Sequence, residues 1–247
     1  MNGGSMAFNN ARIDAVPTLC ASCEGRKKGI CSALDCEQLV ELAKASRKST
    51  AESGATLLGE TEGIDRYANI LSGVVKLTKT LPDGRQQIVG LQFALDFLGR
   101  PYCSESPLNA EAATEVVLCS FTREAFERMM QESPALERRL YRQALDELDE
   151  ARDWMVTLGR KTATEKIASL LLLFARHAEP PEKTGRHFAR FELPLSRADM
   201  ADFLGLTIET VSRQLTRLRN EKIITIENNR LVIVSDLRRL KARAGNS

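Results

Sequence analysis

The segment from residue 194 to residue 224 constrains the fold more than any other part of the chain, because it carries start and stop signals for two short helices. Ser196 and, three residues later, Asp199 form a capping box that opens the first helix. Gly205 is expected to end that helix in the left-handed conformation, and Thr207 can cap the second helix. The buried stripe expected on the second helix is Ile208, Val211, Leu215 and Leu218. Two short helices joined by a tight glycine turn predict a helix-turn-helix.

The polar face of the second predicted helix has residue types that read DNA bases. In a helix-turn-helix this helix enters the major groove with its N-terminal end first. Arginine can bind guanine with two hydrogen bonds, glutamate can accept one from cytosine, and hydroxyl groups read bases more permissively. A hairpin over residues 222–234 that turns at Asn228-Asn229 adds a wing. The expected DNA-binding residues are Thr207, Glu209, Ser212, Arg213, Thr216 and Arg217.

The charge distribution supports this prediction. Residues 194–247 hold ten Lys/Arg and six Asp/Glu, a net charge of 10 − 6 = +4, whereas the whole chain has 35 − 33 = +2. A basic end on a near-neutral chain indicates a polyanion partner. The alternative is a helical hairpin whose polar face contacts only solvent. The agreement of cap, turn, buried stripe, wing and charge favours double-stranded DNA as the partner.

Residues 56–122 predict a small β roll. Ala68–Thr80 and Arg85–Phe93 alternate β-branched and apolar residues, and the Pro-Asp-Gly sequence between them is typical of a hairpin turn. Thr114–Phe121 is expected to be the last strand of the roll, which glycines punctuate at the spacing of a small barrel.

A long helix is expected after the roll, from Ala135 to about Leu158, following a short helix over Thr122–Met130. Its flanks are densely charged, so a narrow apolar stripe on it favours pairing with a second copy over packing on its own roll. We therefore expect a homodimer. The heptad positions of this apolar strip are Tyr141, Ala144, Leu148, Ala151, Met155 and Leu158.

The expected architecture is α+β and has four regions. A strongly apolar helix over Thr164–His177 and a polar linker over Glu179–Arg190 separate the long helix from the helix-turn-helix. The regions are a cysteine-rich segment (1–36), a β-roll sensory domain (37–133), a dimerisation helix (134–160), and a linker helix with the winged helix-turn-helix domain (161–247).

Four of the six cysteines, from Cys20 to Cys36, lie within 17 residues. The chain starts without a signal peptide pattern, and its longest nearly apolar run, Ile167–Ala175, is too short to span a membrane, so we expect a cytoplasmic protein. Because the cytosol keeps thiols reduced, clustered cysteines there indicate metal or redox ligands. The surrounding residues 1–35 show no helix or strand period and are expected to be irregular.

The sequence ETVSRQLTRL, preceded by LSRADMADFLGLT, resembles the DNA-binding domain of the CRP/FNR family of bacterial transcription regulators. The resemblance spans nearly the whole chain and implies a homodimer that binds a two-fold symmetric operator. Glu209, Ser212 and Arg213 resemble the FNR branch, which implies an operator of the form TTGAT, four base pairs, ATCAA. Activation implies contact with RNA polymerase. The exposed turn Leu81–Arg85 corresponds by position to a loop that family members use for this contact.

The resemblance also implies the signal that is sensed. FNR-type oxygen sensors bind a 4Fe–4S cluster through three N-terminal cysteines and one late in the roll. Cys36 is a reserve ligand, because the gap to the third cysteine is longer than in the best-known members, and Cys103 is expected to be a bystander. Gly99-Arg100 stands where relatives that bind a cyclic nucleotide have Gly-Glu, and their Arg-Ser pair is absent before the last strand. A phosphate without that arginine would be poorly held, which disfavours a cyclic nucleotide as the ligand. The matching cluster ligands are Cys20, Cys23, Cys31 and Cys119.

The expected function is therefore an oxygen-responsive activator of anaerobic or microaerobic genes that binds DNA while its cluster is intact. Zinc is a weaker candidate, since only one CxxC pair is present, and haem is weaker still, since the only histidines are His177 and His187. The main alternative is a regulator of the same fold that senses thiol oxidation or another ligand. Without a Gly-rich phosphate loop or a convincing catalytic set, the chain is not expected to be an enzyme.

Overall fold

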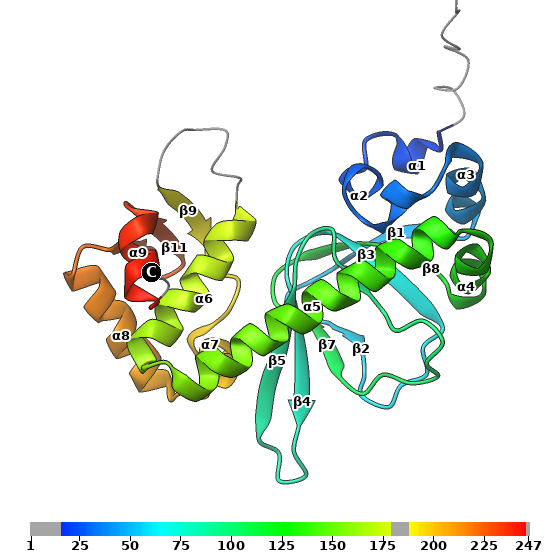
Figure 1. The fold of residues 1–247 in the computed structure, drawn as a ribbon. Helices are drawn as coiled ribbons and strands as arrows, with labels where there is room; N and C mark the ends of the chain where they lie inside the picture. Colours follow the sequence, from blue (N-terminus) through cyan, green and yellow to red (C-terminus); the bar gives the residue numbers. More distant parts are fainter. Residues whose placement is uncertain (1–15, 179–187, 246–247) are drawn as a thin grey trace, which may run out of the picture.

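The computed structural model describes residues 16–178 and 188–245, which form a β roll, a long helix and a C-terminal domain (Figure 1). The roll consists of two four-stranded antiparallel sheets. One sheet has the order β1 (Ser46–Ala51), β8 (Val116–Thr122), β3 (Arg66–Ser72) and β6 (Phe97–Leu98). The other has the order β2 (Thr56–Leu58), β7 (Asn109–Ala112), β4 (Val75–Thr80) and β5 (Gln86–Gln92). The predicted roll is confirmed.

The run predicted as strand over residues 68–80 divides at Gly73, where the chain passes from one sheet to the other. Gly73 has φ +91°, and a Cβ atom there would overlap the carbonyl oxygen of Glu115 and lie 2.9 Å from the Cα atom of Val116. Both neighbouring atoms belong to the backbone at the start of β8, so they cannot move away by a change of side-chain rotamer. Glycine is therefore required at this crossing.

We expect Gly73→Ala to lower the free energy of unfolding by about 3 kcal/mol, because left-handed strain and a backbone overlap add together. The matched control is Gly84→Ala in the turn between β4 and β5. Gly84 has φ +85° but no atom within 4 Å of the added Cβ, so only strain of about 1–2 kcal/mol applies. Urea unfolding of both variants measures the difference. Equal losses for the two variants would contradict the overlap.

The helices after the roll begin where the sequence predicts. Thr122 caps α4 (Arg123–Glu132), and Ser133 caps α5 (Pro134–Arg160), which has proline in its first turn. Helix α5 runs from the roll to the C-terminal domain, where α6 (Ala163–Ala178) is buried along most of its length (Figure 1). No helix in the described ranges is long and apolar enough to cross a membrane.

The C-terminal domain contains α7 (Arg197–Leu204), α8 (Ile208–Asn220) and α9 (Leu237–Arg243), with a sheet of order β10 (Ile224–Glu227), β11 (Leu231–Val234) and β9 (Ala189–Glu192). The capping box at Ser196 and the left-handed C-cap at Gly205 (φ 61°) are both present. Asn228 and Asn229 have φ 49° and 58°, as a two-residue hairpin turn requires.

Two predictions about irregular segments are wrong. The expected polar linker ends two residues too late, because Ala189 and Arg190 belong to β9 and pair with β11; residues 179–187 of that linker lie outside the described ranges. The described part of the segment predicted to be irregular contains short helical turns, α1 (Thr18–Ala21), α2 (Glu24–Lys27) and η2 (Ile30–Ala33), while its residues 1–15 lie outside the described ranges. Helix α3 (Cys36–Lys44) starts at the expected domain border. Turns of four residues are too short to show a hydrophobic period.

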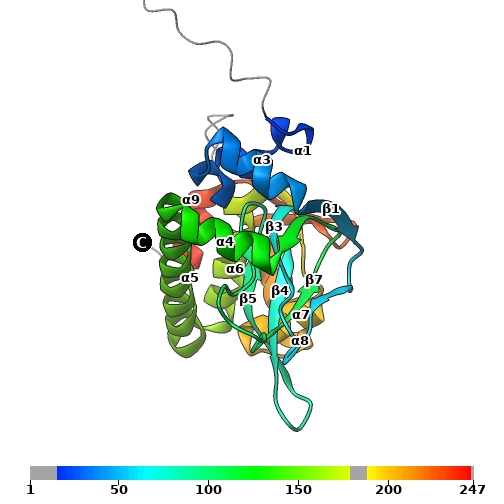
Figure 2. The ribbon, with the colours of Figure 1, turned by 90° about the vertical axis from the view of Figure 1, so that its right-hand side faces the viewer.

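Polar and aromatic contacts join the roll to the C-terminal domain. Lys76 Nζ on β4 lies 2.7 Å from Asp199 Oδ1 on α7 and 2.9 Å from a carboxylate oxygen of Glu111 on β7. Burial raises the pKa of Asp199, but hydrogen bonds from Lys76 and Ser196 outweigh it and hold that pKa below its ordinary value. Aromatic stacking of Phe93 on His177, with ring centroids 3.7 Å apart, makes a second contact. Figure 2 shows α7 beside the hairpin of β4 and β5.

Candidate DNA-binding face and cysteine site

Helix α8, the predicted recognition helix, packs by one face and leaves the other open. Val211, Leu215 and Leu218 are at most 2% exposed, whereas Ile208, predicted to be buried, is 48% exposed. Ile208 is the first residue of α8, directly after the N-cap Thr207, and the buried residues of the helix begin at Val211. The outward residues include every one of the predicted DNA-binding set: Thr207, Glu209, Ser212, Arg213, Thr216 and Arg217.

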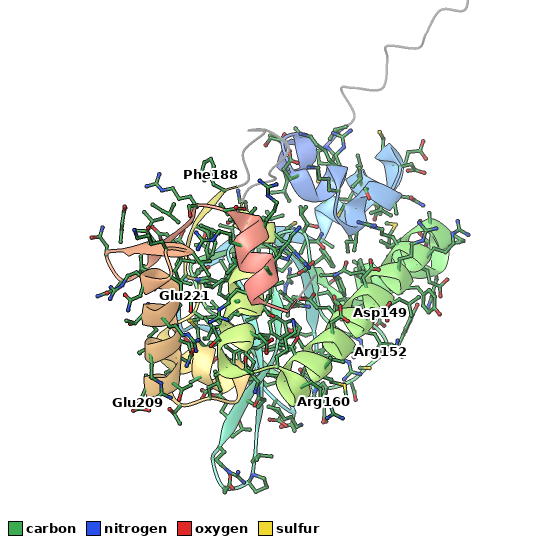
Figure 3. The ribbon with its side chains drawn as sticks, turned by 60° about the vertical axis from the view of Figure 1, so that its left-hand side comes forward. Asp149, Arg152, Arg160, Phe188, Glu209 and Glu221 are labelled. Atoms are coloured by element: carbon green, nitrogen blue, oxygen red, sulfur yellow. The ribbon has the colours of Figure 1, made fainter. Side chains whose placement is uncertain are left out.

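The polar side chains of α8 differ in the hydrogen bonds that they already form within the protein. Thr207 Oγ1 accepts a hydrogen bond from the Thr210 amide and so caps the helix. A hydrogen bond from its own backbone amide, with help from Thr207, holds the pKa of Glu209 below its ordinary value, so this carboxylate is an acceptor at neutral pH. Arg217 Nε, in contrast, donates to Glu221 Oε1 at 3.0 Å. Glu209 and Glu221 mark the two ends of α8 in Figure 3.

The four cysteines predicted to bind a cluster line one cavity. Cys20 and Cys23 come from the first helical turns, Cys31 from η2 and Cys119 from the neighbouring strand β8. The rest of the wall is mostly apolar and is formed by α1, α2, α3, β1, β3 and β8. Neither Cys36, the first residue of α3, nor Cys103, which packs against the apolar cluster that includes Tyr67 and Phe97, lines this cavity.

The thiols of this cavity influence one another. Burial raises the pKa of Cys31 to about 12, and nearby Cys119 adds to the shift. Burial likewise raises the pKa of Cys119 to about 11, with further contributions from Cys23 and Cys20. Asn69, 3% exposed, donates from Nδ2 to Cys31 Sγ at 3.3 Å, and its Oδ1 is buried with no hydrogen-bond partner among the described residues. Four thiols and an incompletely paired amide are a suitable donor set for a thiolate-bound centre.

The sulfur atoms do not converge into a metal-binding group in the described ranges. The cavity measures about 20 Å³, room for about one water molecule. A larger centre therefore does not fit this cavity unless its walls move. The turns that carry Cys20, Cys23 and Cys31 are short, and their caps lack side-chain hydrogen bonds.

The cysteine segment, defined as residues 18–33, also contacts helix α5. Ile30 in η2 and Leu136 near the start of α5 are both fully buried in one apolar cluster. Arg139 Nη2 on α5 donates to the backbone carbonyl of Lys28 at 2.6 Å. The cysteine segment therefore packs directly against the N-terminal half of α5.

Helix α5 exposes large apolar side chains along its length. Tyr141 is 66%, Leu148 45% and Met155 72% exposed, and Ala144 and Ala151 are exposed beside them. Leu158 differs from the other predicted strip residues, because it is half-buried against the core of the C-terminal domain. Leu145 and Val156, which were not predicted, are exposed too. Asp149 and Arg152 project from this helix in Figure 3.

A cavity of about 270 Å³ lies between the roll and α5. Its lining includes Gly99 and Pro101 from the loop after β6, and Glu137 and Glu147 from α5. Burial raises the pKa of Glu147. The described residues that line this cavity include no lysine or arginine, so it offers a phosphate no cationic partner, which supports the prediction that a cyclic nucleotide is not the ligand.

A roll, a long helix with an exposed apolar strip and a winged helix-turn-helix with an open polar face together define a DNA-binding transcription regulator. Comparison with known families agrees. Residues 48–133 match the cyclic nucleotide-binding domain, and residues 165–243 match the Crp-like helix-turn-helix domain. The chain belongs to the CRP/FNR family of transcription regulators, whose members are DNA-binding proteins rather than enzymes.

Individual relatives resemble the chain over most of its length. It is 54% identical over 225 residues to a probable transcriptional activator of Rhizobium leguminosarum bv. viciae, covering 91% of this chain and 92% of that one. It is 42% identical to the transcriptional activator protein FnrL of Cereibacter sphaeroides, covering 95% and 96%. The structure of FixK2 from Bradyrhizobium japonicum matches with a TM-score of 0.72 and 30% identity, covering 80% of this chain and 96% of that one.

Proposed function

We propose that this chain is an oxygen-responsive transcription activator that binds a TTGAT-N4-ATCAA operator as a homodimer while a 4Fe–4S cluster is bound by Cys20, Cys23, Cys31 and Cys119. The observation that carries the proposal is the shared cavity of these four cysteines, contributed by a loosely capped N-terminal segment and strand β8. Similarity to activators named FnrL and Anr supports the activating role.

A bound 4Fe–4S cluster supplies iron and sulfide that oxygen can oxidise, which makes such a centre a sensor. The chain itself contributes the four thiolates, and Asn69 orients Cys31 by its hydrogen bond. The contact from Arg139 to the Lys28 carbonyl then connects the order of the cysteine segment to α5.

Pairing along α5 is the step that this connection controls. The acidic residues Asp146, Asp149 and Asp153 lie beside the apolar strip, so two copies repel one another unless the strip is held in register. An allosteric coupling of about 1–3 kcal/mol is enough to switch such a balanced equilibrium. With both copies aligned, the two recognition helices reach adjacent major grooves, and an activator so placed contacts RNA polymerase.

Anaerobic purification tests the proposal. We expect a brown protein with about four irons and four sulfides per chain, which bleaches in air and then loses affinity for the operator. A shuffled duplex of equal length is the control for specific binding. A colourless protein after anaerobic reconstitution that binds the operator equally in air would overturn the cluster and favour the alternative, a thiol switch at Cys20 and Cys23, which line the same cavity.

A further inference from the structure

A second polar pocket lies at the edge of the recognition helix, between α8, the start of α7 and the tip of the wing. It measures about 200 Å³. Ser212 and Thr216 of α8 form one wall, and Asn229 of the wing turn faces them. Two arginines, Arg197 and Arg219, complete its polar lining. The pocket therefore borders the same face of α8 that carries the predicted base-contacting residues.

Helix geometry gives Arg219 and Arg217 different surroundings. Ser212, Thr216 and Arg219 are spaced four and three residues apart, so they share one side of α8 and line the pocket together. Arg217 points elsewhere and donates to Glu221. Arg219 makes no ion pair with a carboxylate in the part of the chain that the structure describes.

The second arginine of the pocket is poorly satisfied. Arg197 is half-buried, and burial lowers the pKa of its guanidinium. Among the described residues its side chain donates only to the Asn229 carbonyl, at 3.5 Å, and to Met200 Sδ, at 3.7 Å. Both distances are long, and neither acceptor is charged. A partly desolvated guanidinium of this kind gains most from a bidentate anion such as a phosphate.

We propose that this pocket binds a phosphate of the DNA backbone, with Arg219 and Arg197 as its cationic partners and the hydroxyls of Ser212 and Thr216 as further donors. Arg219, not Arg217, is then the backbone-contacting arginine at this end of α8. The inference rests on the DNA-binding part of the proposed function and adds a contact that positions the helix without reading sequence.

Salt dependence of DNA binding tests the pocket. The full-length protein, purified anaerobically, is compared with Arg219→Ala and Arg238→Ala on the operator and on an unrelated duplex. We expect Arg219→Ala to weaken binding to both duplexes by the same factor, about tenfold near 0.1 M salt, and to reduce the slope of log K against log salt by about 0.9 per phosphate lost. The matched control is Arg238→Ala, which removes an exposed arginine of α9 outside the pocket and should keep the wild-type slope.

Two further variants separate charge from folding. Arg219→Lys should retain most of the slope, because it keeps the cation, and Arg197→Ala should reproduce the loss seen for Arg219→Ala. An unchanged slope in Arg219→Ala, or an equal change in Arg238→Ala, would overturn the pocket. If wild type shows no preference for the operator but Arg219→Ala still reduces the slope on both duplexes, the operator proposal fails and the pocket stands.

Discussion

Cys31→Ser is expected to abolish iron binding by the anaerobically purified protein, whereas Cys36→Ser leaves it intact. The two cysteines are five residues apart, and both are near enough in sequence to act as the third ligand. Only Cys31 lines the cavity that Cys20, Cys23 and Cys119 share, while Cys36 opens helix α3 behind its N-cap Asp35. Since a serine hydroxyl does not replace a thiolate ligand of iron, removing Cys31 leaves three ligands for the cluster.

Iron and sulfide analysis with visible absorbance measures this difference. We expect iron to fall from about four per chain to below one in Cys31→Ser, and operator affinity to fall at least about tenfold with it. Serine can still accept the hydrogen bond from Asn69, so circular dichroism should show a folded protein. Full iron content in Cys31→Ser together with loss in Cys36→Ser would contradict the ligand assignment and require α3 to rearrange.

Leu148→Asp is expected to produce a monomer and to weaken operator binding by about a hundredfold or more. Leu148 lies at the middle of the exposed apolar strip of α5, flanked by Tyr141 and Met155. In a dimer this position would bury a carboxylate beside its copy and near the aspartates already on the helix, which is strongly unfavourable. Loss of pairing removes the gain from binding two half-sites at once, which is about a hundredfold or greater for linked sites.

The control for this variant is Arg142→Ala, which changes the net charge by the same amount but lies about 100° around the helix from Tyr141. Light scattering after size exclusion gives the oligomeric state, and gel shifts on a full operator and a single half-site give the affinities. We expect Arg142→Ala to stay dimeric and half-site binding to be unchanged in both variants. A dimeric Leu148→Asp protein would exclude the strip as the dimer interface.

The local elements were predictable because their signals are short-range. The capping box at Ser196, the left-handed turn at Gly205 and the cap at Thr207 each depend on residues within one helical turn, and the structure contains all three. The same holds for the break at Ser133 and the wing turn at Asn228. Such signals depend on backbone geometry that neighbouring residues alone determine.

The errors lie where distant residues decide the outcome. Strand β9 forms because β11 offers it hydrogen bonds, and nothing in the sequence around Ala189 indicates that partner. Leu158 is at a strip position by spacing, yet it packs on the C-terminal core because α6 and α7 meet the end of α5 there. Lys76 contacts Asp199 across 123 positions of sequence, a pairing that no local pattern contains.

The sequence by itself determined the helix-turn-helix, the wing, the long helix with its apolar strip, and the family to which the chain belongs. Caps, turns and periodicity depend on residues that are close together in the sequence. Only the tertiary structure decided which cysteines share a cavity and which arginine of α8 faces the pocket beside the wing. It also decided how the cysteine segment reaches α5 through Arg139. These features depend on the packing of distant segments, whose relative positions are set by burial of a common core rather than by any local spacing.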